Sequence, residues 1–326
     1  MSRIPASPPA IAPLETSVAR PLWSVMIPVY NCANYLPETL HSVLQQQLPE
    51  HLMQIEVIDD ASSDADVEEI VNRIGQGRVT YYRQPENVGS LHNFATSINR
   101  ARGQLVHLLH GDDRVRPGFY QELGDLFEHY PEIGAAYCRF GYIDEVGKPK
   151  HDQSPEMQRP GILNNYLLRI SENNRIQYAA IAVKREVYER LGAFFGTTYG
   201  EDWEMWVRIA RNYPMGYTPS VLAEYRHHTN SISGNKHVYG EYLLDLATVM
   251  GHIQHHLPLS DREPVLKRSK KFYSHYAIRQ ANNLWHLRHD KDATFKYIRQ
   301  VLHMHQDPVL YYKILKLLVK VAINKR

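Results

Sequence analysis

The sequence has little cysteine and no long apolar segment. Its two cysteines, Cys32 and Cys138, are far apart, so we expect neither a disulfide framework nor a cysteine-based metal site. Both are predicted to be small buried residues of a protein that works in a reducing compartment. No run reaches the roughly 18 apolar residues that a transmembrane helix requires, and residues 1–15 lack the apolar core of a signal peptide. These absences favour a cytoplasmic location.

A strong charge of one sign is also missing. The chain has 37 Lys and Arg against 35 Asp and Glu, a formal charge of +2 at pH 7, so its overall charge does not point to nucleic acid as a partner. The length of 326 residues suits one large domain, or one domain with an appendage. We expect a flexible, proline-rich leader at residues 1–21, a main domain at 22–235, and a basic, histidine-rich helical region at 236–326.

Short apolar runs alternate with helical patterns in the main domain. Runs rich in β-branched residues predict buried strands, and apolar residues at helical spacing predict amphipathic helices. The strands are expected at 23–29, 55–58, 79–83 and 105–109, and the helices at 35–47, 64–74, 90–102 and 117–130. After residue 133 the pattern is looser, with strands expected at 133–144 and 176–183, a strand followed by a polar loop within 217–233, and helices at 184–191 and from Glu201. The alternation predicts βαβ units, and therefore an α/β sandwich with a mostly parallel central sheet.

Polar side chains follow three of the predicted strands, as the pairs Tyr30-Asn31, Asp59-Asp60 and Asp112-Asp113. Ligands of such sheets bind beyond the carboxyl ends of the strands. Adjacent carboxylates at a buried strand end need compensation by a cation or by solvent. They are also the ligands that Mg²⁺ and Mn²⁺ prefer, with substrate phosphates completing the shell. Each pair alone could be a solvated turn in which Asp caps the next helix, but together the three pairs favour a nucleotide pocket.

A second acidic site stands at Glu201-Asp202, next to Trp203 and near Trp206. A carboxylate at the start of a helix can be no more than a cap that interacts with the helix dipole. Large apolar faces beside it could instead raise its pKa toward that of a general base. Tryptophan faces also suit sugar rings. We expect Trp206 in the core, and Glu201, Asp202 and Trp203 facing a cleft.

The ordered set of these motifs resembles that of family 2 glycosyltransferases with the Rossmann-like GT-A fold. Each motif is weak alone, but their order is specific, and the resemblance covers residues 22–235. The motifs are Pro28-x-Tyr30-Asn31, Asp59-Asp60-x-Ser62-x-Asp64, Asn87-x-Gly89 with Asn93, Gly111-Asp112-Asp113, Glu201-Asp202 and Tyr225-Arg226-x-His228.

The resemblance implies a donor site for a nucleotide sugar, most commonly a UDP-sugar in this family. Asp113 would ligate a divalent cation, Mn²⁺ or Mg²⁺, with Asp112 on the ribose or the metal, and His228 would lie near the metal or the diphosphate. The base, ribose and sugar would be held by the remaining motif residues, which are Pro28, Tyr30, Asn31, Asp59 or Asp60, Asn87, Gly89 and Trp203.

The resemblance also implies an inverting reaction. Asp202, with Glu201 beside it, would deprotonate an acceptor hydroxyl for in-line attack, while the metal and positive groups stabilise the departing nucleoside diphosphate. The expected function is transfer of one sugar to a saccharide or lipid-linked acceptor in cell-surface polysaccharide biosynthesis. The Gln-x-x-Arg-Trp motif of processive synthases is absent, and so is any Arg-Trp pair, which favours transfer of a single residue.

The chain departs from the family pattern at His110, where the family often has Asp. His110 could bind metal or sugar, but packing at a strand end is favoured, and His227 is expected to be structural or exposed.

Two other functions of the protein remain as alternatives. A non-catalytic nucleotide-sugar or glycan-binding module is disfavoured by the aspartates at 112, 113 and 202. A nucleotidyltransferase would carry a glycine-rich basic loop near its first strand, whereas residues 28–36 contain neither glycine nor a basic residue.

Residues 308–326 predict a basic amphipathic helix. On a helical wheel its lysines, Lys313, Lys316 and Lys320, fall on one face, and Ile314, Leu315, Leu318 and Ala322 fall opposite. Such a helix can pack on the preceding helices or another subunit, or it can lie in an anionic membrane interface. The second alternative would make the protein a peripheral one at the inner face of the membrane.

Overall fold

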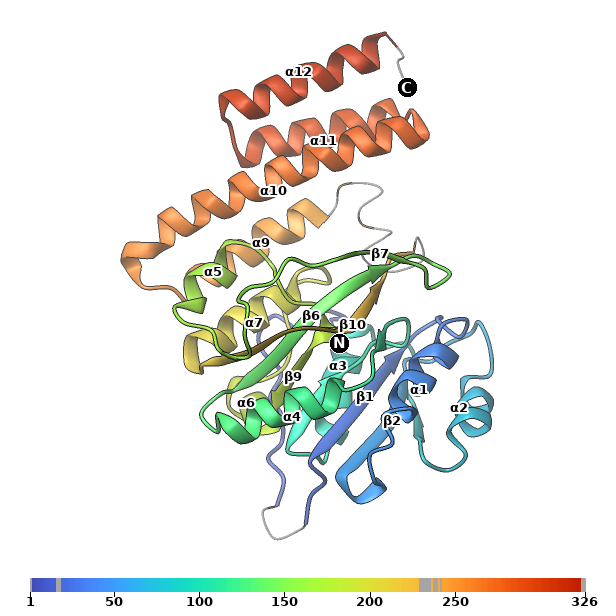
Figure 1. Cartoon of the computed structure of the whole chain (residues 1–326). Helices are drawn as coiled ribbons and strands as arrows, with labels where there is room; N and C mark the ends of the chain where they lie inside the picture. Colours follow the sequence, from blue (N-terminus) through green and yellow to red (C-terminus); the bar gives the residue numbers. More distant parts are fainter. Residues whose placement is uncertain (1, 16–18, 229–235, 237–239, 241, 324–326) are drawn as a thin grey trace. The chain divides into compact units, whose positions relative to one another are not determined.

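The computed structural model describes residues 2–15, 19–228, 236, 240 and 242–323 (Figure 1). The chain divides into two compact units. The sheet unit comprises residues 1–166, 176–198 and 208–227, and the helical unit comprises 167–175, 199–207 and 228–326. The boundary expected at 235/236 therefore differs from the observed division, because two short segments from the middle of the chain belong with the C-terminal helices.

A ten-stranded sheet forms the centre of the sheet unit. Its strand order is β3-β2-β1-β4-β9-β6-β10-β5, with β7 paired to β6 and β8 paired to β10. The strands are β1 Trp23–Val29, β2 Met53–Asp59, β3 Thr80–Arg83, β4 Leu105–Leu108, β5 Arg114–Val115, β6 Ala135–Ile143, β7 Pro149–Asp152, β8 Gly161–Ile162, β9 Ile181–Lys184 and β10 Met215–Arg226. Strands β3, β2, β1 and β4 are mutually parallel, as predicted. Beyond them the sheet is mixed, because β9 runs antiparallel to both of its neighbours.

Strands β1 and β2 are buried along their whole length, as expected for a parallel sheet covered on both faces by helices. Helix α3 packs on β1 and β2, and α4 packs on β6 and β10. The helices of this unit are α1 Leu36–Leu44, α2 Val67–Gly75, α3 Ser90–Arg100, α4 Phe119–His129 and α6 Arg185–Leu191, with short 3₁₀ helices at Glu50–Leu52 and Tyr178–Ala180. The predicted α/β sandwich is therefore confirmed, and each polar strand end lies where the parallel strands finish.

The N-terminal segment differs from the flexible leader that its prolines suggested. Two of its carbonyls accept backbone hydrogen bonds, that of Pro5 from Gly196 at 2.9 Å and that of Pro9 from Ala193 at 2.8 Å. The amide of Ala12 donates to Asn99 Oδ1 at 3.0 Å. Prolines suit positions such as 5 and 9, where the residue contributes only its carbonyl. Residues 2–15 are thus tied to the sheet unit.

Of the two cysteines, Cys138 is buried and Cys32 is half-buried, and both are free thiols. The prediction of buried, unpaired cysteines is confirmed for Cys138 and holds in part for Cys32. Burial raises the pKa of each thiol, which disfavours the reactive thiolate.

The helical unit contains a long helix, α10, that contacts α9, α11 and α12. Its helices are α9 Tyr242–Gln254, α10 Leu259–Arg288, α11 Lys291–Met304 and α12 Pro308–Ala322, and it also includes most of α5 (Tyr166–Glu172) and the first part of α7 (Glu201–Asn212). Asp290 and Asp307 cap α11 and α12 by accepting hydrogen bonds from Ala293 N and Leu310 N. In the part of the chain that the structure describes, no helix is long and apolar enough to cross a membrane.

Helix α12 buries a different face from the one that the helical wheel suggested. Its buried side chains are Leu310, Ile314, Leu317 and Val321. Of the predicted apolar face only Ile314 is buried, whereas Leu315 is 61% exposed. The helix has apolar residues on most of its circumference, so the wheel alone could not select the face that packs.

Candidate functional site

The turn after β4 brings His110, Asp112 and Asp113 together. One ligand atom from each, a ring nitrogen or a carboxylate oxygen, lies within 4.8 Å of the others. Gly111 permits this turn to approach β1 closely, because an added Cβ would stand 2.9 Å from both Cys32 Sγ and a Val29 methyl carbon. The amide of Gly111 also donates to the carbonyl of Pro28 at 3.2 Å. The sequence-predicted Asp112-Asp113 pair is therefore fixed against the end of the first strand.

Asp113 is 1% exposed and is held mainly by backbone contacts. Its Oδ1 accepts a hydrogen bond from Arg226 N at 2.8 Å, and its carbonyl accepts one from Thr39 Oγ1 at 2.7 Å. Burial, and next the charge of the neighbouring Asp112, raise the pKa of Asp113 well above its usual range, although the hydrogen bond and charge of Arg226 act in the opposite direction. A cation bound beside two neighbouring buried carboxylates would stabilise their ionised forms.

Arg226, at the end of β10, connects both aspartates to the rest of the sheet unit. Its Nε donates to the carbonyl of Asp112 at 2.8 Å, while its backbone holds Asp113. Its guanidinium also donates to Glu38 Oε2 at 2.8 Å and lies over the ring of Tyr35, with 4.9 Å to the ring centroid. The side chain is 1% exposed, so these contacts fix the geometry of the acidic turn.

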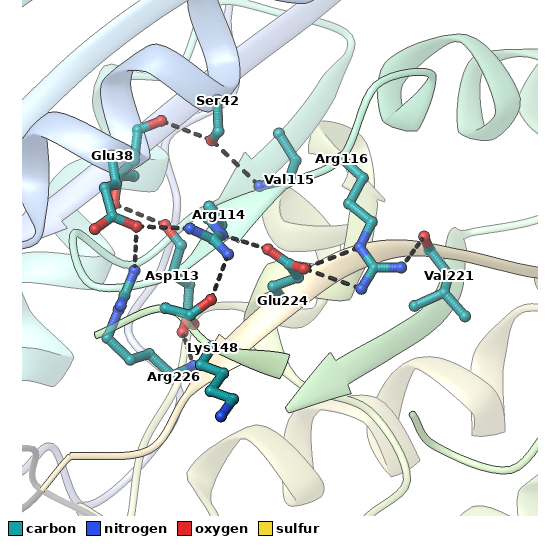
Figure 2. A network of polar contacts seen from close by, with 12 residues as sticks. Glu38, Ser42, Asp113, Arg114, Val115, Arg116, Lys148, Val221, Glu224 and Arg226 are labelled. Atoms are coloured by element: carbon teal, nitrogen blue, oxygen red, sulfur yellow. Dashed lines mark hydrogen bonds and ion pairs between the residues drawn. The ribbon is translucent and has the colours of Figure 1, made fainter. Parts of the chain in front are cut away.

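Figure 2 shows that this arrangement continues as a network of ion pairs. Glu38 also accepts from Arg114 Nη1 at 2.7 Å, and Arg114 pairs with Glu224. Glu224 pairs with Arg116 as well, at 2.9 Å. Burial alone would raise the pKa of Glu38, but its bonds and attraction to Arg226 and Arg114 outweigh burial and lower that pKa. Glu38 is therefore an ionised partner of both arginines near neutral pH.

His110 is both packed and placed as a metal ligand. Its ring contacts those of Phe94 and Tyr178, with centroid distances of 5.1 Å and 4.4 Å. Burial lowers the pKa of His110, even though the charge of Asp112 acts to raise it, so the ring is neutral and keeps a nitrogen lone pair. Its Nε2 is buried and has no hydrogen-bond partner among the residues that the structure describes. A buried, unpartnered nitrogen beside two carboxylates fits a divalent cation, which neutral imidazole and carboxylate oxygens both bind.

At the end of β2, Asp59 has both carboxylate oxygens engaged by protein groups. Its Oδ2 accepts from Tyr81 Oη at 2.8 Å and pairs with Arg83, and its Oδ1 accepts from Ser62 N at 2.8 Å. The residue is 0% exposed. These contacts assign Asp59 to holding the ends of β2 and β3, so its contact with a nucleotide stays a prediction.

Asp60 joins two of the predicted motifs. Its Oδ1 accepts from Val88 N at 2.8 Å, and its Oδ2 accepts from Gly89 N at 2.9 Å and from Asn87 Nδ2 at 3.1 Å. Gly89 has φ +91°, a conformation that favours glycine. Burial raises the pKa of Asp60, with opposing contributions that include the charge of Arg3. The structure thus brings Asp60, Asn87 and Gly89 together and gives Asp60 the role of positioning the 87–89 loop.

The end of β1 presents one exposed aromatic ring. Tyr30 is 52% exposed, whereas Pro28 is buried within the strand. Asn31 adopts φ +50° and accepts from Ser63 N through Oδ1 at 2.8 Å. Of these three predicted donor residues, Tyr30 and Asn31 are exposed to a ligand, whereas Pro28 lies in the buried strand.

In the helical unit, Asp202 is a buried carboxylate with few partners. It is 7% exposed, accepts from Asn174 Nδ2 at 2.8 Å, and accepts from Trp203 N at 2.7 Å. Burial raises the pKa of Asp202 to about 6, although these hydrogen bonds act to lower it. Asn174 is itself held, since its amide donates to Tyr273 Oη at 3.0 Å. A carboxylate with a pKa near neutrality is suited to general-base chemistry.

The prediction that Trp203 faces a cleft is wrong. Its ring is 0% exposed, its Nε1 donates to the carbonyl of Ile170 at 2.5 Å, and it packs on Tyr273 with 5.3 Å between centroids. A fully buried ring has no face for a sugar, so in this structure Trp203 is part of the core around Asp202. Trp206 is buried as predicted, and Glu201 is 9% exposed at the start of α7.

The two histidines after Arg226 are His227 and His228. The amide of His227 donates to the carbonyl of Ile143 at 2.9 Å, and its ring contacts Tyr142 and Tyr225, in agreement with the structural role expected for it. His228 belongs to the helical unit, whereas Asp112 and Asp113 belong to the sheet unit. Its role near a metal therefore stays a prediction, as does joint action of Asp202 with the donor residues.

Sequence reasoning missed three contributors to the site. Arg226 was part of a recognised motif without a role, Glu38 was not singled out within the helix predicted at 35–47, and His110 was considered as a metal ligand but favoured as a packing residue. A signal existed for Arg226 and His110, since both stand within motifs. For Glu38 there was none, because its partners are 76 and 188 positions away in the sequence.

The comparisons with known proteins agree with this geometry. The chain is 29% identical over 227 residues to the Bacillus subtilis protein named putative teichuronic acid biosynthesis glycosyltransferase TuaG, covering 67% of this chain and 83% of that one. The matches span from 34% to 83% of the length of the curated relatives.

Two solved structures share the fold over nearly the whole chain. S. aureus TarS 1–349 in complex with UDP-GlcNAc has a TM-score of 0.65 at 15% identity, covering 92% of this chain and 89% of TarS. The mannosyltransferase PcManGT from Pyrobaculum calidifontis, in complex with GDP-Man and Mn²⁺, has a TM-score of 0.57 at 18% identity, with 98% and 92% covered. These likenesses confirm the GT-A fold with its helical extension. The profile described as Glycosyl transferase family 2 matches residues 24–192, more than half of the sequence. The chain therefore belongs to glycosyl transferase family 2 and is a glycosyltransferase.

Proposed function

We propose that the protein is a metal-dependent inverting glycosyltransferase that moves one sugar from a nucleotide-sugar donor to a saccharide or lipid-linked acceptor. The observation that carries this proposal is the cluster of His110, Asp112 and Asp113, which Arg226 holds in place. The printed names of the related proteins support it, since TarS binds UDP-GlcNAc, PcManGT binds GDP-Man with Mn²⁺, and TuaG is assigned to teichuronic acid biosynthesis. The name of TuaG supports a role in cell-surface polysaccharide biosynthesis, and the UDP-GlcNAc complex of TarS supports a UDP-sugar as donor.

In the donor half of the reaction, Asp112, Asp113 and His110 would hold Mn²⁺ or Mg²⁺. When bound, the cation would neutralise the donor diphosphate and stabilise the charge of the departing nucleoside diphosphate. Tyr30 offers an exposed ring for the base, and Asp60 positions the 87–89 loop by accepting from its amides. The rigid network around Arg226 keeps the carboxylates in place before a donor arrives, so that binding requires little reorganisation.

In the acceptor half, we propose Asp202 as the general base. Its carboxylate would take the proton of an acceptor hydroxyl while the hydroxyl oxygen forms a bond to the anomeric carbon. The bond from that carbon to the diphosphate breaks, and its electron pair leaves with the nucleoside diphosphate. A single displacement of this kind inverts the anomeric configuration. The proposal that Asp202 and the donor residues act on one substrate is based on the order of the family motifs, because the two sets lie in different compact units.

A panel of nucleotides tests the donor half. A ligand that binds only the folded state raises the melting temperature. In the presence of Mn²⁺ we expect UDP to raise it more than GDP or dTDP do. The variants Asp112→Asn and His110→Phe should lose the Mn²⁺-dependent part of the shift. Asp125→Asn, at an exposed carboxyl on α4, is the matched control and should behave as wild type. If UDP stabilises all four proteins equally with and without Mn²⁺, the cluster does not bind the donor metal.

Donor turnover distinguishes an enzyme from a non-catalytic module with the same fold. Release of the nucleoside diphosphate from UDP-GlcNAc, UDP-glucose or GDP-mannose should depend on Mn²⁺ and on Asp112. Tight binding of a nucleotide sugar that is neither hydrolysed nor transferred would favour the binding module instead.

We also propose that helix α12 contacts an anionic membrane surface, which would place the protein at the inner face of the membrane. The face of α12 that does not pack on the bundle exposes four apolar side chains, Val309 (56%), Tyr312 (66%), Leu315 (61%) and Val319 (50%), with Lys316 exposed among them. Residues 236–326 contain sixteen Lys and Arg and seven Asp and Glu, a net charge of +9, whereas the rest of the chain is net negative. An apolar stripe within a basic region complements anionic lipid, while the same charge opposes pairing with a second copy.

Vesicle sedimentation tests this contact. The protein should bind vesicles that contain phosphatidylglycerol more strongly than pure phosphatidylcholine vesicles, and added salt should weaken binding. The double variant Leu315→Ser and Val319→Ser should lose binding, and Val146→Ser, at an 82% exposed residue of the sheet unit, should not. Equal binding by all variants would refute the assignment to α12, and a dimer in light scattering that the double variant abolishes would identify a second copy as the occupant.

A further inference from the structure

A second cluster of metal-ligating side chains lies within the helical unit, in residues that no family motif covers. It consists of His275 on α10, His305 immediately after α11, and Asp307 at the start of α12. One ligand atom from each lies within 4.8 Å of the others. His275 Nε2 is 3.1 Å from Asp307 Oδ2, and His305 Nε2 is 3.0 Å from the same oxygen. Three residues from three helical elements thus point their ligand atoms at one place.

The spacing of these atoms is close to that of a tetrahedral metal shell. With metal–ligand distances of about 2.0–2.1 Å, adjacent ligand atoms of a tetrahedral zinc site lie roughly 3.3 Å apart. The two measured distances from Asp307 are only slightly shorter, so a metal would enter with small side-chain movements. Two imidazole nitrogens and one carboxylate oxygen also form a donor set that suits Zn²⁺.

The surroundings of Asp307 orient its carboxylate for one-oxygen coordination. Its Oδ1 accepts the capping hydrogen bond from Leu310 N at 2.7 Å, which leaves Oδ2 directed at the two histidines. The three side chains are 13–16% exposed, which leaves access for the metal and for a water molecule as fourth ligand.

Two lysines oppose the metal. Lys313 Nζ lies 3.0 Å from His275 Nδ1, and Lys271 Nζ lies 3.6 Å from Asp307 Oδ2. Because an ammonium group only donates, His275 accepts at Nδ1 and carries its proton on Nε2 in this arrangement. A metal on Nε2 would displace that proton, Nδ1 would become a donor, and Lys313 would turn away. Binding is therefore in competition with protons and with this ammonium group.

We propose that His275, His305 and Asp307 form a Zn²⁺ site that fastens the connection between α11 and α12 to α10. The site is separate in sequence from the donor-site cluster at 110–113, and it requires no nucleotide. Its role is structural, because bound metal would stabilise the packing of the C-terminal helices against one another.

Calorimetric titration of the full-length protein with Zn²⁺ at about neutral pH tests the proposal, together with the melting temperature. Wild type should bind Zn²⁺ and melt at a higher temperature with it. His275→Ala, His305→Ala and Asp307→Asn should weaken binding at least about ten-fold and lose the stabilisation. Asn is itself a good N-cap, so Asp307→Asn keeps the start of α12 while removing the charged ligand.

Three further variants complete the test. His303→Ala removes an exposed histidine of α11, two positions before His305. This variant should bind Zn²⁺ as wild type does. Asp112→Asn, in the donor cluster, should leave this binding event unchanged, which keeps the two sites distinguishable. Lys313→Gln should tighten binding, because it removes a competing charge and supplies an acceptor for the proton on His275 Nδ1. Zn²⁺ affinity that is the same in His275→Ala, His305→Ala and wild type would overturn the proposal and leave a hydrogen-bonded cluster only.

Discussion

Replacing Asp202 by Asn should lower activity and raise stability at the same time. Asn has nearly the same shape, and its carbonyl oxygen can still accept from Trp203 N or from Asn174 Nδ2. It cannot take a proton from an acceptor hydroxyl. Positioned general bases contribute roughly 10²–10⁴-fold, so we expect transfer to the acceptor to fall by at least about 100-fold, with little change in affinity for the nucleoside diphosphate.

The stability change follows from the raised pKa. Burial shifts the pKa of Asp202 from 3.8 to about 6, and each pKa unit corresponds to about 1.4 kcal/mol. The folded state therefore binds the proton more tightly than the unfolded chain does. The stabilisation from the protonated carboxyl is complete below the unfolded pKa and disappears as pH rises through about 6. At about pH 8 wild type holds a buried charge that Asp202→Asn lacks, so the variant should be more stable by up to roughly 3 kcal/mol.

Urea unfolding at two pH values and a nucleoside-diphosphate release assay measure both effects. The stability gain of Asp202→Asn should be present at about pH 8 and should shrink on acidification through the folded pKa, towards zero at about pH 4. Wild-type transfer at low substrate concentration should rise with pH through about 6, because only the ionised carboxylate accepts a proton. The control is Asp125→Asn, which should change neither quantity. Full activity in Asp202→Asn would refute the base assignment, and a loss of stability at about pH 8 would refute the account of its pKa.

Two further predictions concern residues that the structure reassigned. Arg226→Gln should destabilise the protein by roughly 1–3 kcal/mol in urea unfolding and weaken Mn²⁺-dependent binding of UDP. The control Arg190→Gln removes an exposed arginine and should do neither. Unchanged metal dependence in Arg226→Gln would show that Asp112 and Asp113 hold their geometry without it. Trp203→Phe should destabilise by roughly 1–3 kcal/mol through loss of volume and of the bond to Ile170, with unchanged KM for the donor sugar; a selective rise in that KM would restore Trp203 as a sugar-binding residue.

Much of the sheet unit could be predicted because its first two strands follow a simple rule. A buried parallel strand is a short β-branched run, and Trp23–Val29 and Met53–Asp59 have no polar interruption large enough to obscure it. The direction of β9 could not be predicted in this way. The direction of a strand is decided by where the chain returns to the sheet. The short apolar run Ile181–Lys184 is compatible with a parallel or an antiparallel strand.

The three polar strand ends were predicted to converge, and the structure shows why they differ in role. Asp59 and Asp60 accept most of their hydrogen bonds from the sheet unit itself, and only the turn at 110–113 gathers several metal-ligating atoms. The sequence shows which residues are acidic, but which group donates a hydrogen bond to each carboxylate oxygen depends on the tertiary structure. The same holds for Trp203, since an aromatic residue at the first turn of a helix can face solvent or the core, and here the carbonyl of Ile170 takes its N–H.

For Asp202 and Trp203, the same neighbouring rings in the sequence lead to two predictions. The raised pKa of Asp202 agrees with the structure, and the exposed sugar-binding face of Trp203 does not. The sequence argument placed large apolar rings beside the carboxylate and expected them both to raise its pKa and to bind sugar. These two roles compete, because a ring that is buried enough to remove water from Asp202 has no face left for a ligand. At 0% exposure Trp203 performs the first role only. We therefore expect sugar recognition to come from other side chains, and we expect substitutions in the core around Asp202 to change its pKa.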